Sequence, residues 1–243
     1  MSEKIDDLVA KLLEGIEEDE SLEFELPSKG LGYTEDLGKI KLRSISYEDE
    51  KFASQASIND KNFNHLDFLL NRALQTKIDL DNLFIFDKLF LIFKLRQITY
   101  GSQMKSSIEC PQCSQESSIS VDFNKIPVNY VPDTFADPIE VTLPKSKKKC
   151  FLTLPRARHE KYMKSTNAIM NNLWRFIFSF EGVENREVIS KVLDKLSLVD
   201  INYILSNLVK TYGIDTKVKF VCVGCGFSEN TEIPFNFDFF TES

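Results

Sequence analysis

Apolar residues recur with a helical period at the start of the chain. They occupy positions i, i+3, i+4, i+7, i+8 and i+11 of one stripe, formed by Ile5, Leu8, Val9, Leu12, Leu13 and Ile16. This spacing predicts an amphipathic helix over residues 3–18. Residues 1–25 also hold ten acidic side chains against two lysines, a local charge of about −8. We expect residues 1–21 to form an N-terminal helix that either packs on its own domain or docks as a detached arm in a partner's groove.

The pattern from residue 22 to residue 103 predicts strands followed by helices. Residues 22–26 (LEFEL) and 39–45 (KIKLRSI) alternate apolar and polar side chains, which is typical of strands. Helical spacing follows in three segments, at 47–55, 64–76 and 81–100. The most apolar stretch, 80–98, contains five charged residues and therefore predicts a buried helix rather than a membrane anchor. We expect an α+β region over 22–103.

Short hairpins alternate with helices in the remainder of the chain. Paired β-prone segments predict hairpins at 106–123, 138–154 and 217–237. Residues 156–213 return to helical spacing, with one apolar face made of Met170, Leu173, Trp174, Ile177 and Phe178 and another made of Ile201, Ile204, Leu205, Leu208 and Val209. We expect an inserted hairpin and helical region over 126–213. The whole chain is thus predicted to be α+β, largely helical with short β-hairpins.

Five cysteines add chemistry to two of these hairpins. Cys110 and Cys113 form one CxxC pair and Cys222 and Cys225 form a second, while Cys150 stands alone. The acidic N-terminus lacks the basic start and apolar block of a secretory signal, so we expect reduced thiols rather than disulfides. A CxxC turn presents two thiolates on one side of a tight bend, and two such turns complete a tetrahedral metal site.

The paired motifs predict a split zinc ribbon over 104–125 and 214–240. All four paired cysteines would hold one structural zinc ion per chain, with 108 residues (114–221) inserted between the two turns. Thiolate tetrahedra also accept iron, so the motif alone leaves the metal open. Two unrelated reduced pairs and redox dithiols are the alternatives, and the redox reading is disfavoured because each CxxC precedes a polar loop and a strand. Cys150 is expected to be a reduced strand residue.

The sequence offers few groups for catalysis. His65 and His159 are the only histidines, and neither lies near a hydrolase motif. No Walker A, G-x-G-x-x-G or G-x-S-x-G pattern occurs. The acidic cluster at 48–50 lies in a polar stretch and is expected to be solvated. We therefore predict that the chain is not an enzyme.

Charge argues against a general nucleic-acid binder, with one local exception. The chain has 30 basic and 37 acidic residues, a net charge of −7, whereas nucleic-acid binders usually carry a net basic surface. Residues 145–164 hold eight basic residues against one acid, a local charge of about +7. A zinc-ribbon nucleic-acid-binding or regulatory module that uses this stretch is the alternative function. A solvated hairpin tip or a dock for an acidic partner explains the same residues.

Several segments occur in a characteristic succession. LPSKGLGY (26–33) is followed by DKLFLIFKLR (87–96), by ITYG (98–101) and by the first CxxC pair. This succession resembles the T4-type bacteriophage baseplate hub proteins over residues 22–125. A second LP-bearing segment, LTLPR (152–156), and the closing CxxC pair extend the resemblance.

The resemblance implies a non-enzymatic hub subunit or hub assembly factor of a contractile phage tail. Its partners would be other baseplate hub proteins or further copies of itself, without nucleic acid and without a membrane anchor. It would be found in the virion baseplate, or in the host cytoplasm during assembly. The Phe-rich, His-poor composition agrees with a role in protein contacts. The expected contact elements are the N-terminal apolar stripe and the alternating C-terminal phenylalanines Phe235, Phe237 and Phe239.

Overall fold

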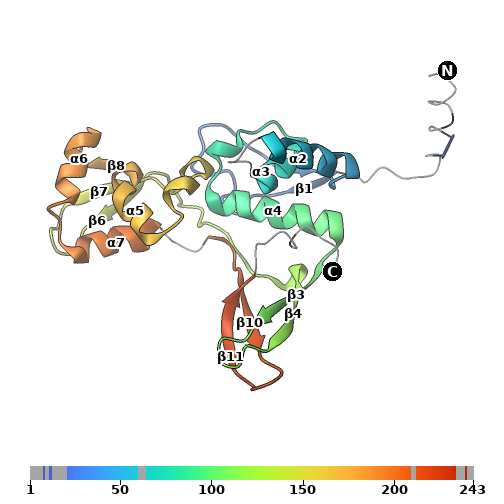
Figure 1. The fold of residues 1–243 in the computed structure, drawn as a ribbon. Helices are drawn as coiled ribbons and strands as arrows, with labels where there is room; N and C mark the ends of the chain where they lie inside the picture. Colours follow the sequence, from blue (N-terminus) through green and yellow to red (C-terminus); the bar gives the residue numbers. More distant parts are fainter. Residues whose placement is uncertain are drawn as a thin grey trace.

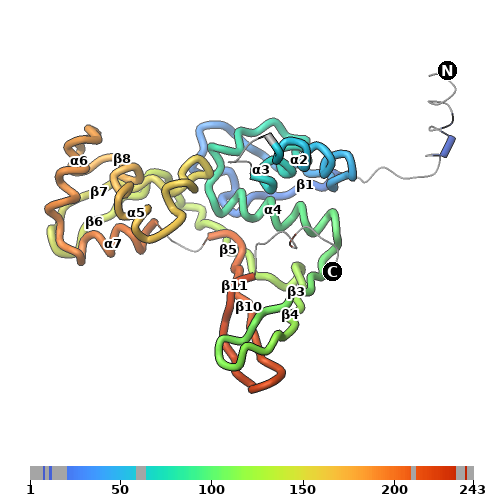
Figure 2. Tube along the Cα trace, in the orientation of Figure 1, coloured from blue at the N-terminus to red at the C-terminus, as the bar shows by residue number. Residues whose placement is uncertain are grey.

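The computed structural model of the chain has three parts (Figures 1 and 2). It describes residues 8, 11–12, 21–59, 64–208, 212–233 and 239. A body is built around the long helix α4, a lobe lies beside one end of the body, and two β-hairpins project from the other side of α4. Most of the predicted N-terminal helix lies outside the described residues.

The body contains the strands and helices that the alternating and helical patterns predict, with bounds that differ by up to four residues; the last helix, for example, starts four residues later than predicted. Strand β1 (Leu22–Phe24) pairs antiparallel with β2 (Ile40–Leu42). Three helices follow, α2 (Tyr47–Asn59), α3 (His65–Ala73) and α4 (Ile85–Tyr100), with a 3-10 turn (Leu80–Asn82) before α4. Helix α4 is apolar on nearly all sides and is buried, as a central helix should be. None of the described helices is long and apolar enough to cross a membrane.

The acidic cluster at 48–50 is not solvated throughout, because Asp49 is buried. Arg43 Nη1 and Arg72 Nε each lie 2.6 Å from a carboxylate oxygen of Asp49. The hydrogen bond from Arg43 is the main reason that the pKa of Asp49 lies well below its ordinary value. The sequence-based expectation was wrong for this residue, since its two arginine partners come from β2's end and from α3.

The lobe has a three-stranded antiparallel sheet in the order β6-β7-β8, with helices packed on one face. Its strands are β6 (Ile139–Thr142), β7 (Lys149–Leu152) and β8 (Ile177–Phe180). Its helices are α5 (Thr166–Asn172), α6 (Arg186–Leu193) and α7 (Leu198–Leu208), with 3-10 turns at Ala157–Tyr162 and Leu173–Phe176. The lobe buries its own hydrophobic cluster, separate from that of the body.

Two predictions on the lobe had different outcomes. Ile177 and Phe178 were predicted on a helix face, but they belong to β8, where β-branched and aromatic residues pair with β7 and bury Ile177. The prediction for Cys150 is confirmed, since it lies in β7 opposite Val141 and Phe180. Burial raises the pKa of the Cys150 thiol to about 12, so this cysteine stays a neutral core residue.

The chain enters and leaves the lobe side by side. Strand β5 (Val128–Asn129) on the way in pairs antiparallel with β9 (Gly213–Ile214) on the way out. Gly213 has a φ of +83°, and a Cβ at this position would come within 2.9 Å of the Phe86 carbonyl oxygen in α4. Only glycine lets the returning strand approach α4 this closely.

A buried polar network joins the LPSKGLGY segment to the start of α4. Asp87 accepts hydrogen bonds from the Ser28 N–H (3.0 Å) and from the Tyr33 hydroxyl (2.7 Å). The same Tyr33 oxygen accepts the Phe84 N–H at 2.8 Å. Asp87 is fully buried, so these two donors take the place of water around its carboxyl group.

The LTLPR segment completes this network from the side of the lobe. Arg156 donates to the carbonyl oxygens of Gly32 and Asn82, both at 2.7 Å, and to the Asp137 carboxylate at 2.9 Å. Its guanidinium also lies 4.3 Å from the Phe84 ring centroid. One buried arginine therefore links the lobe to the body. Arg156 belongs to the basic stretch 145–164, so this residue of the stretch forms contacts within the chain.

The ionisation of Asp87 should make stability depend on pH. Burial raises the pKa of Asp87 to about 6, above the value of about 3.9 for an unfolded chain. Its stabilising contribution is therefore full below pH ~4 and is lost as the pH rises through ~6. Relative to Asp87→Asn, the wild-type protein should lose about 2–3 kcal/mol of unfolding free energy between pH 4 and pH 7, measured by urea unfolding. A difference that does not change with pH would contradict this assignment.

Candidate metal centre

Two antiparallel hairpins bring the CxxC pairs together. The first joins β3 (Gln103–Glu109) to β4 (Glu116–Asp122), and the second joins β10 (Lys217–Val221) to β11 (Ser228–Glu232). Each CxxC motif forms the turn of its hairpin, and the two hairpins lie side by side below α4 (Figure 1).

The first hairpin is attached to the end of α4 by a buried arginine. Arg96 donates to the carbonyl oxygens of Gly101 (3.0 Å) and Gln103 (3.2 Å), and its guanidinium lies 5.2 Å from the Phe123 ring centroid. Gly101, with a φ of +82°, ends the helix and turns the chain into β3. The position of the first thiol pair thus depends on how α4 ends.

The two cysteine turns have the same backbone conformation. In the first, the Cys110 N–H donates to Gln115 O (3.0 Å) and the Ser114 N–H donates to Cys110 O (2.9 Å). In the second, Cys222, Phe227 and Gly226 make the equivalent bonds at 2.8 and 3.0 Å. The residue after each second cysteine is left-handed, with a φ of 57° at Ser114 and 72° at Gly226. This shared turn points both thiols of a pair in one direction.

The four sulfur atoms form a compact cluster. All of them lie within 4.8 Å of one another, and the Sγ–Sγ distances are 3.7 Å for Cys110–Cys225 and 3.6 Å for Cys113–Cys222. A tetrahedral ion with metal–sulfur bonds of ~2.3 Å would separate its sulfurs by about 3.8 Å. A disulfide would need about 2.05 Å. The cluster therefore fits a metal ion bound by all four predicted cysteines, and these cysteines are not in disulfides.

One thiol of the cluster is prepared to ionise. The pKa of Cys222 is lowered to about 6, first by the Cys225 N–H and then by the Gly224 N–H, against the effect of burial. The Gly224 nitrogen lies 3.4 Å from Cys222 Sγ. Donors of this kind favour the thiolate, which is the form that binds metal.

Ser117 supports the cluster, and the sequence motif does not reveal it. This buried residue of β4 donates its hydroxyl to Cys222 Sγ (3.7 Å) and accepts the Val223 N–H (3.2 Å). It therefore links the first hairpin to the second cysteine turn. The alternation of ESSISVD, in which Ser117, Ile119 and Val121 face inward, is the one signal that could have pointed to it.

The residues predicted to contact a partner differ in their exposure. Phe239 was expected to face a partner, but it is buried in the body, with its ring centroid 5.2 Å from that of Phe93 and 6.0 Å from that of Phe123. Leu8 and Leu12 are exposed. The other predicted contacts lie outside the described residues: Ile5, Val9, Leu13, Ile16, Phe235 and Phe237.

The basic stretch 145–164 does not form one continuous basic surface. Arg156 is buried in the network with Asp137. Lys149 Nζ lies 2.8 Å from Glu140, and Lys148 Nζ lies 3.7 Å from Glu181. These pairings reduce the charge available to phosphates.

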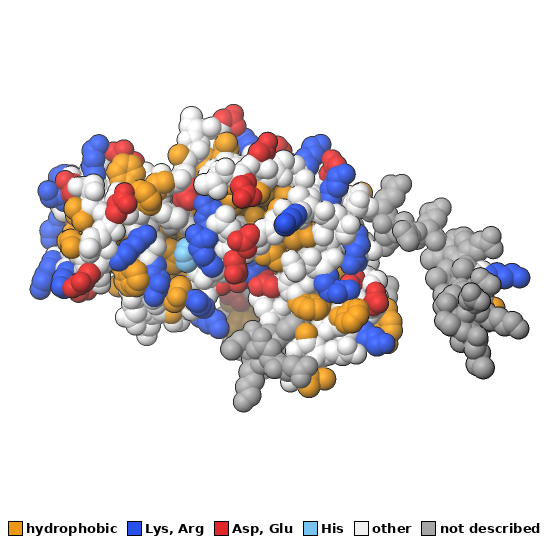
Figure 3. Space-filling view, turned by 90° about the horizontal axis from the view of Figure 1, so that it is seen from above, with side chains coloured by type: hydrophobic (Ala, Val, Ile, Leu, Met, Phe, Trp, Pro, Cys, Tyr) orange, Lys and Arg blue, Asp and Glu red, His pale blue; other side chains and the backbone are white. Residues whose placement is uncertain are grey.

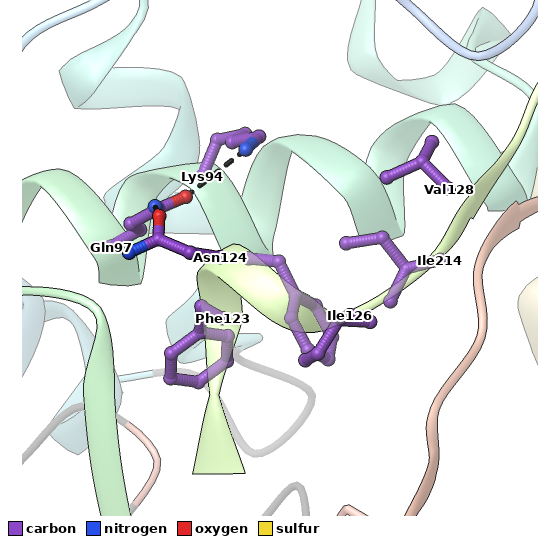
Figure 4. Close-up of a pocket in the computed structure, with 8 residues that line it drawn as sticks. Lys94, Gln97, Phe123, Asn124, Ile126, Val128 and Ile214 are labelled. Atoms are coloured by element: carbon purple, nitrogen blue, oxygen red, sulfur yellow. Dashed lines mark hydrogen bonds between the residues drawn. The ribbon is translucent and has the colours of Figure 1, made fainter.

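A cavity lies between α4 and the β5–β9 pair. It has a volume of about 170 Å³ and is lined by Phe93, Lys94, Gln97, Phe123, Asn124, Ile126, Val128 and Ile214 (Figure 4). Its polar lining consists of one ammonium group and two amides, joined by hydrogen bonds from Lys94 to Gln97 (3.0 Å) and from Gln97 to Asn124 (2.6 Å). No carboxylate, imidazole or thiol lines it.

Removing the Ser117 hydroxyl should weaken metal binding without changing the ligands. Ser117→Ala loses both hydrogen bonds, and loss of such a supporting group typically reduces metal affinity by about 10–100-fold. Ser118→Ala, on the exposed face of the same strand, is the matched control. Competition with a chromophoric chelator measures both variants, and equal affinities would show that Ser117 does not support the site.

Comparison with known proteins identifies the family of the chain. The family model described as T4 bacteriophage base plate protein matches residues 19–241. Neither the curated proteins nor the solved structures give a match. Because the family match covers nearly the whole chain, including both cysteine turns, the protein belongs to the T4 bacteriophage base plate protein family.

Proposed function

We propose that the protein is a non-enzymatic subunit or assembly factor of the baseplate hub in a contractile phage tail. Membership of the base plate family implies a place in the phage tail baseplate and contacts with other baseplate proteins. The specific hub assignment is supported by the succession from LPSKGLGY to the first CxxC pair. The protein would join the hub while the tail is assembled in the host cytoplasm.

We further propose that the four-cysteine cluster holds one structural zinc ion per chain. The observation that carries this assignment is the pair of Sγ–Sγ distances, 3.6 and 3.7 Å, between hairpins more than 100 residues apart. Zinc accepts four thiolates without a preference for another geometry. Four protein ligands leave no coordination position for water or substrate, so the ion would stabilise the fold rather than catalyse a reaction.

Protein contacts are the function that the remaining surface supports best. Large exposed apolar side chains occur on several elements, including Ile58 on α2 and Leu198 on α7. The basic residues of 145–164 are partly used within the chain, which disfavours the nucleic-acid alternative.

The metal assignment predicts a defined stoichiometry. Native mass spectrometry of protein purified without added metal should find one zinc ion per chain. Cys225→Ser should lose the ion and melt at a lower temperature, because only three thiols remain and no ion links the two hairpins. Cys150→Ala, which changes a cysteine outside the cluster, should lose stability but keep the metal. Retention of zinc by Cys225→Ser would contradict the assignment.

The hub assignment is tested in phage. Cells infected with a phage that lacks this chain should accumulate heads but no complete baseplates, as seen by electron microscopy. Expression of the chain in the same cells should restore complete tails. Normal tails without the protein would contradict a role in the hub.

A further inference from the structure

An exposed apolar pair lies at the start of α7, at the end of the lobe away from the body. Leu198 is 71% exposed and Val199 is 57% exposed. Together with Lys145, Lys147 and Lys195 we call these residues the lobe patch. Figure 3 views the molecule from above, and on the part of the lobe seen from that side basic, acidic and apolar side chains lie close to one another.

Hydrogen bonds hold the basic turn beside this apolar pair. The buried carboxylate of Asp200 accepts the Lys145 N–H at 2.8 Å and the Ser146 N–H at 3.1 Å. Because Asp200 lies in the first turn of α7, the turn at 145–148 is fixed next to Leu198 and Val199. The lobe patch therefore combines an apolar centre with a basic border.

The lysines of the lobe patch keep their charge available. Lys148 and Lys149 pair with Glu181 and Glu140. The three lysines of the lobe patch, Lys145, Lys147 and Lys195, are exposed. Within the described part of the chain their side chains form no ion pair. A partner with acidic side chains could bind these lysines without breaking an ion pair that they form within the protein.

The same chain carries a segment of complementary chemistry. Residues 1–25 have a charge of about −8, and the apolar stripe of their predicted helix includes Leu8 and Leu12, which are 58% and 71% exposed. Residues 138–208, which form the lobe, hold twelve basic and seven acidic residues, a net charge of about +5. The acidic residues and the exposed Leu8 and Leu12 of this segment thus match the basic residues and the exposed apolar pair of the lobe patch.

We propose that the lobe patch binds the N-terminal helix of a second copy of this chain. The predicted helix precedes β1, which belongs to the body, whereas the lobe patch belongs to the lobe (Figure 1), so a contact between copies would join two different surfaces head to tail. Repetition of such a contact gives a ring if its rotation closes. The proposal does not depend on the metal ion or on the hub assignment.

Complementary variants test this contact by sedimentation velocity between about 1 and 100 μM. An interface of one helix is small, so we expect a dissociation constant in roughly the micromolar range. The wild-type protein should self-associate. An arm variant (Leu8→Ser with Leu12→Ser) and a patch variant (Leu198→Ser with Val199→Ser) should each be monomeric. A mixture of the two should form a heterodimer, because one intact helix and one intact lobe patch remain.

Controls separate this contact from general effects. Ile58→Glu removes an exposed apolar side chain on α2, in the body, and should leave self-association unchanged. Both double variants should keep the wild-type metal content and circular dichroism. A failure of this proposal therefore leaves the metal and hub assignments standing.

Three results would overturn the proposal. The first is a wild-type protein that stays monomeric at all concentrations, as it would if the helix bound its own lobe or a different protein. The second is self-association that neither double variant reduces. The third is salt-dependent binding of a duplex oligonucleotide to the wild-type protein that the patch variant no longer shows. This result would mean that the lobe patch binds phosphates.

Discussion

Two cysteine turns separated by 108 residues share one small volume, and the path of the chain between them follows from this constraint. The intervening lobe must leave the first hairpin and return to the second at nearly the same place, which the β5–β9 pair achieves. Four thiolates cannot gather within 4.8 Å of one another without a compensating charge, because like charges disfavour each other's ionisation. A bound cation removes this repulsion and makes the approach of the hairpins stabilising.

A second junction, without metal, sets the lobe against the body. Arg156 reaches across from the lobe to Gly32 and Asp137, while Asp87 and Tyr33 organise the facing loop at the start of α4. The two segments that carry the family resemblance outside the cysteines, LPSKGLGY and LTLPR, therefore meet in space. Their shared role is to build the joint between the two parts, through the contacts of Tyr33, Gly32 and Arg156.

Local patterns predicted most of the elements and the four cysteines that cluster, because helical spacing, strand alternation and CxxC turns act over a few residues. Features that depend on distant partners could not be predicted in this way. Strand β8 is decided by its pairing with β7, and the burial of Asp49 is decided by Arg43 and Arg72. Ser117 and Phe239 are likewise explained only by the Cys222 thiol and the Phe93 ring that they contact.

X-ray absorption spectroscopy at the zinc edge can establish whether all four thiols bind one metal ion. We expect a first coordination shell of four sulfur atoms at ~2.3 Å, without nitrogen or oxygen. A shell that contains nitrogen or oxygen ligands, or protein that binds no zinc while its thiols remain reduced, would contradict it.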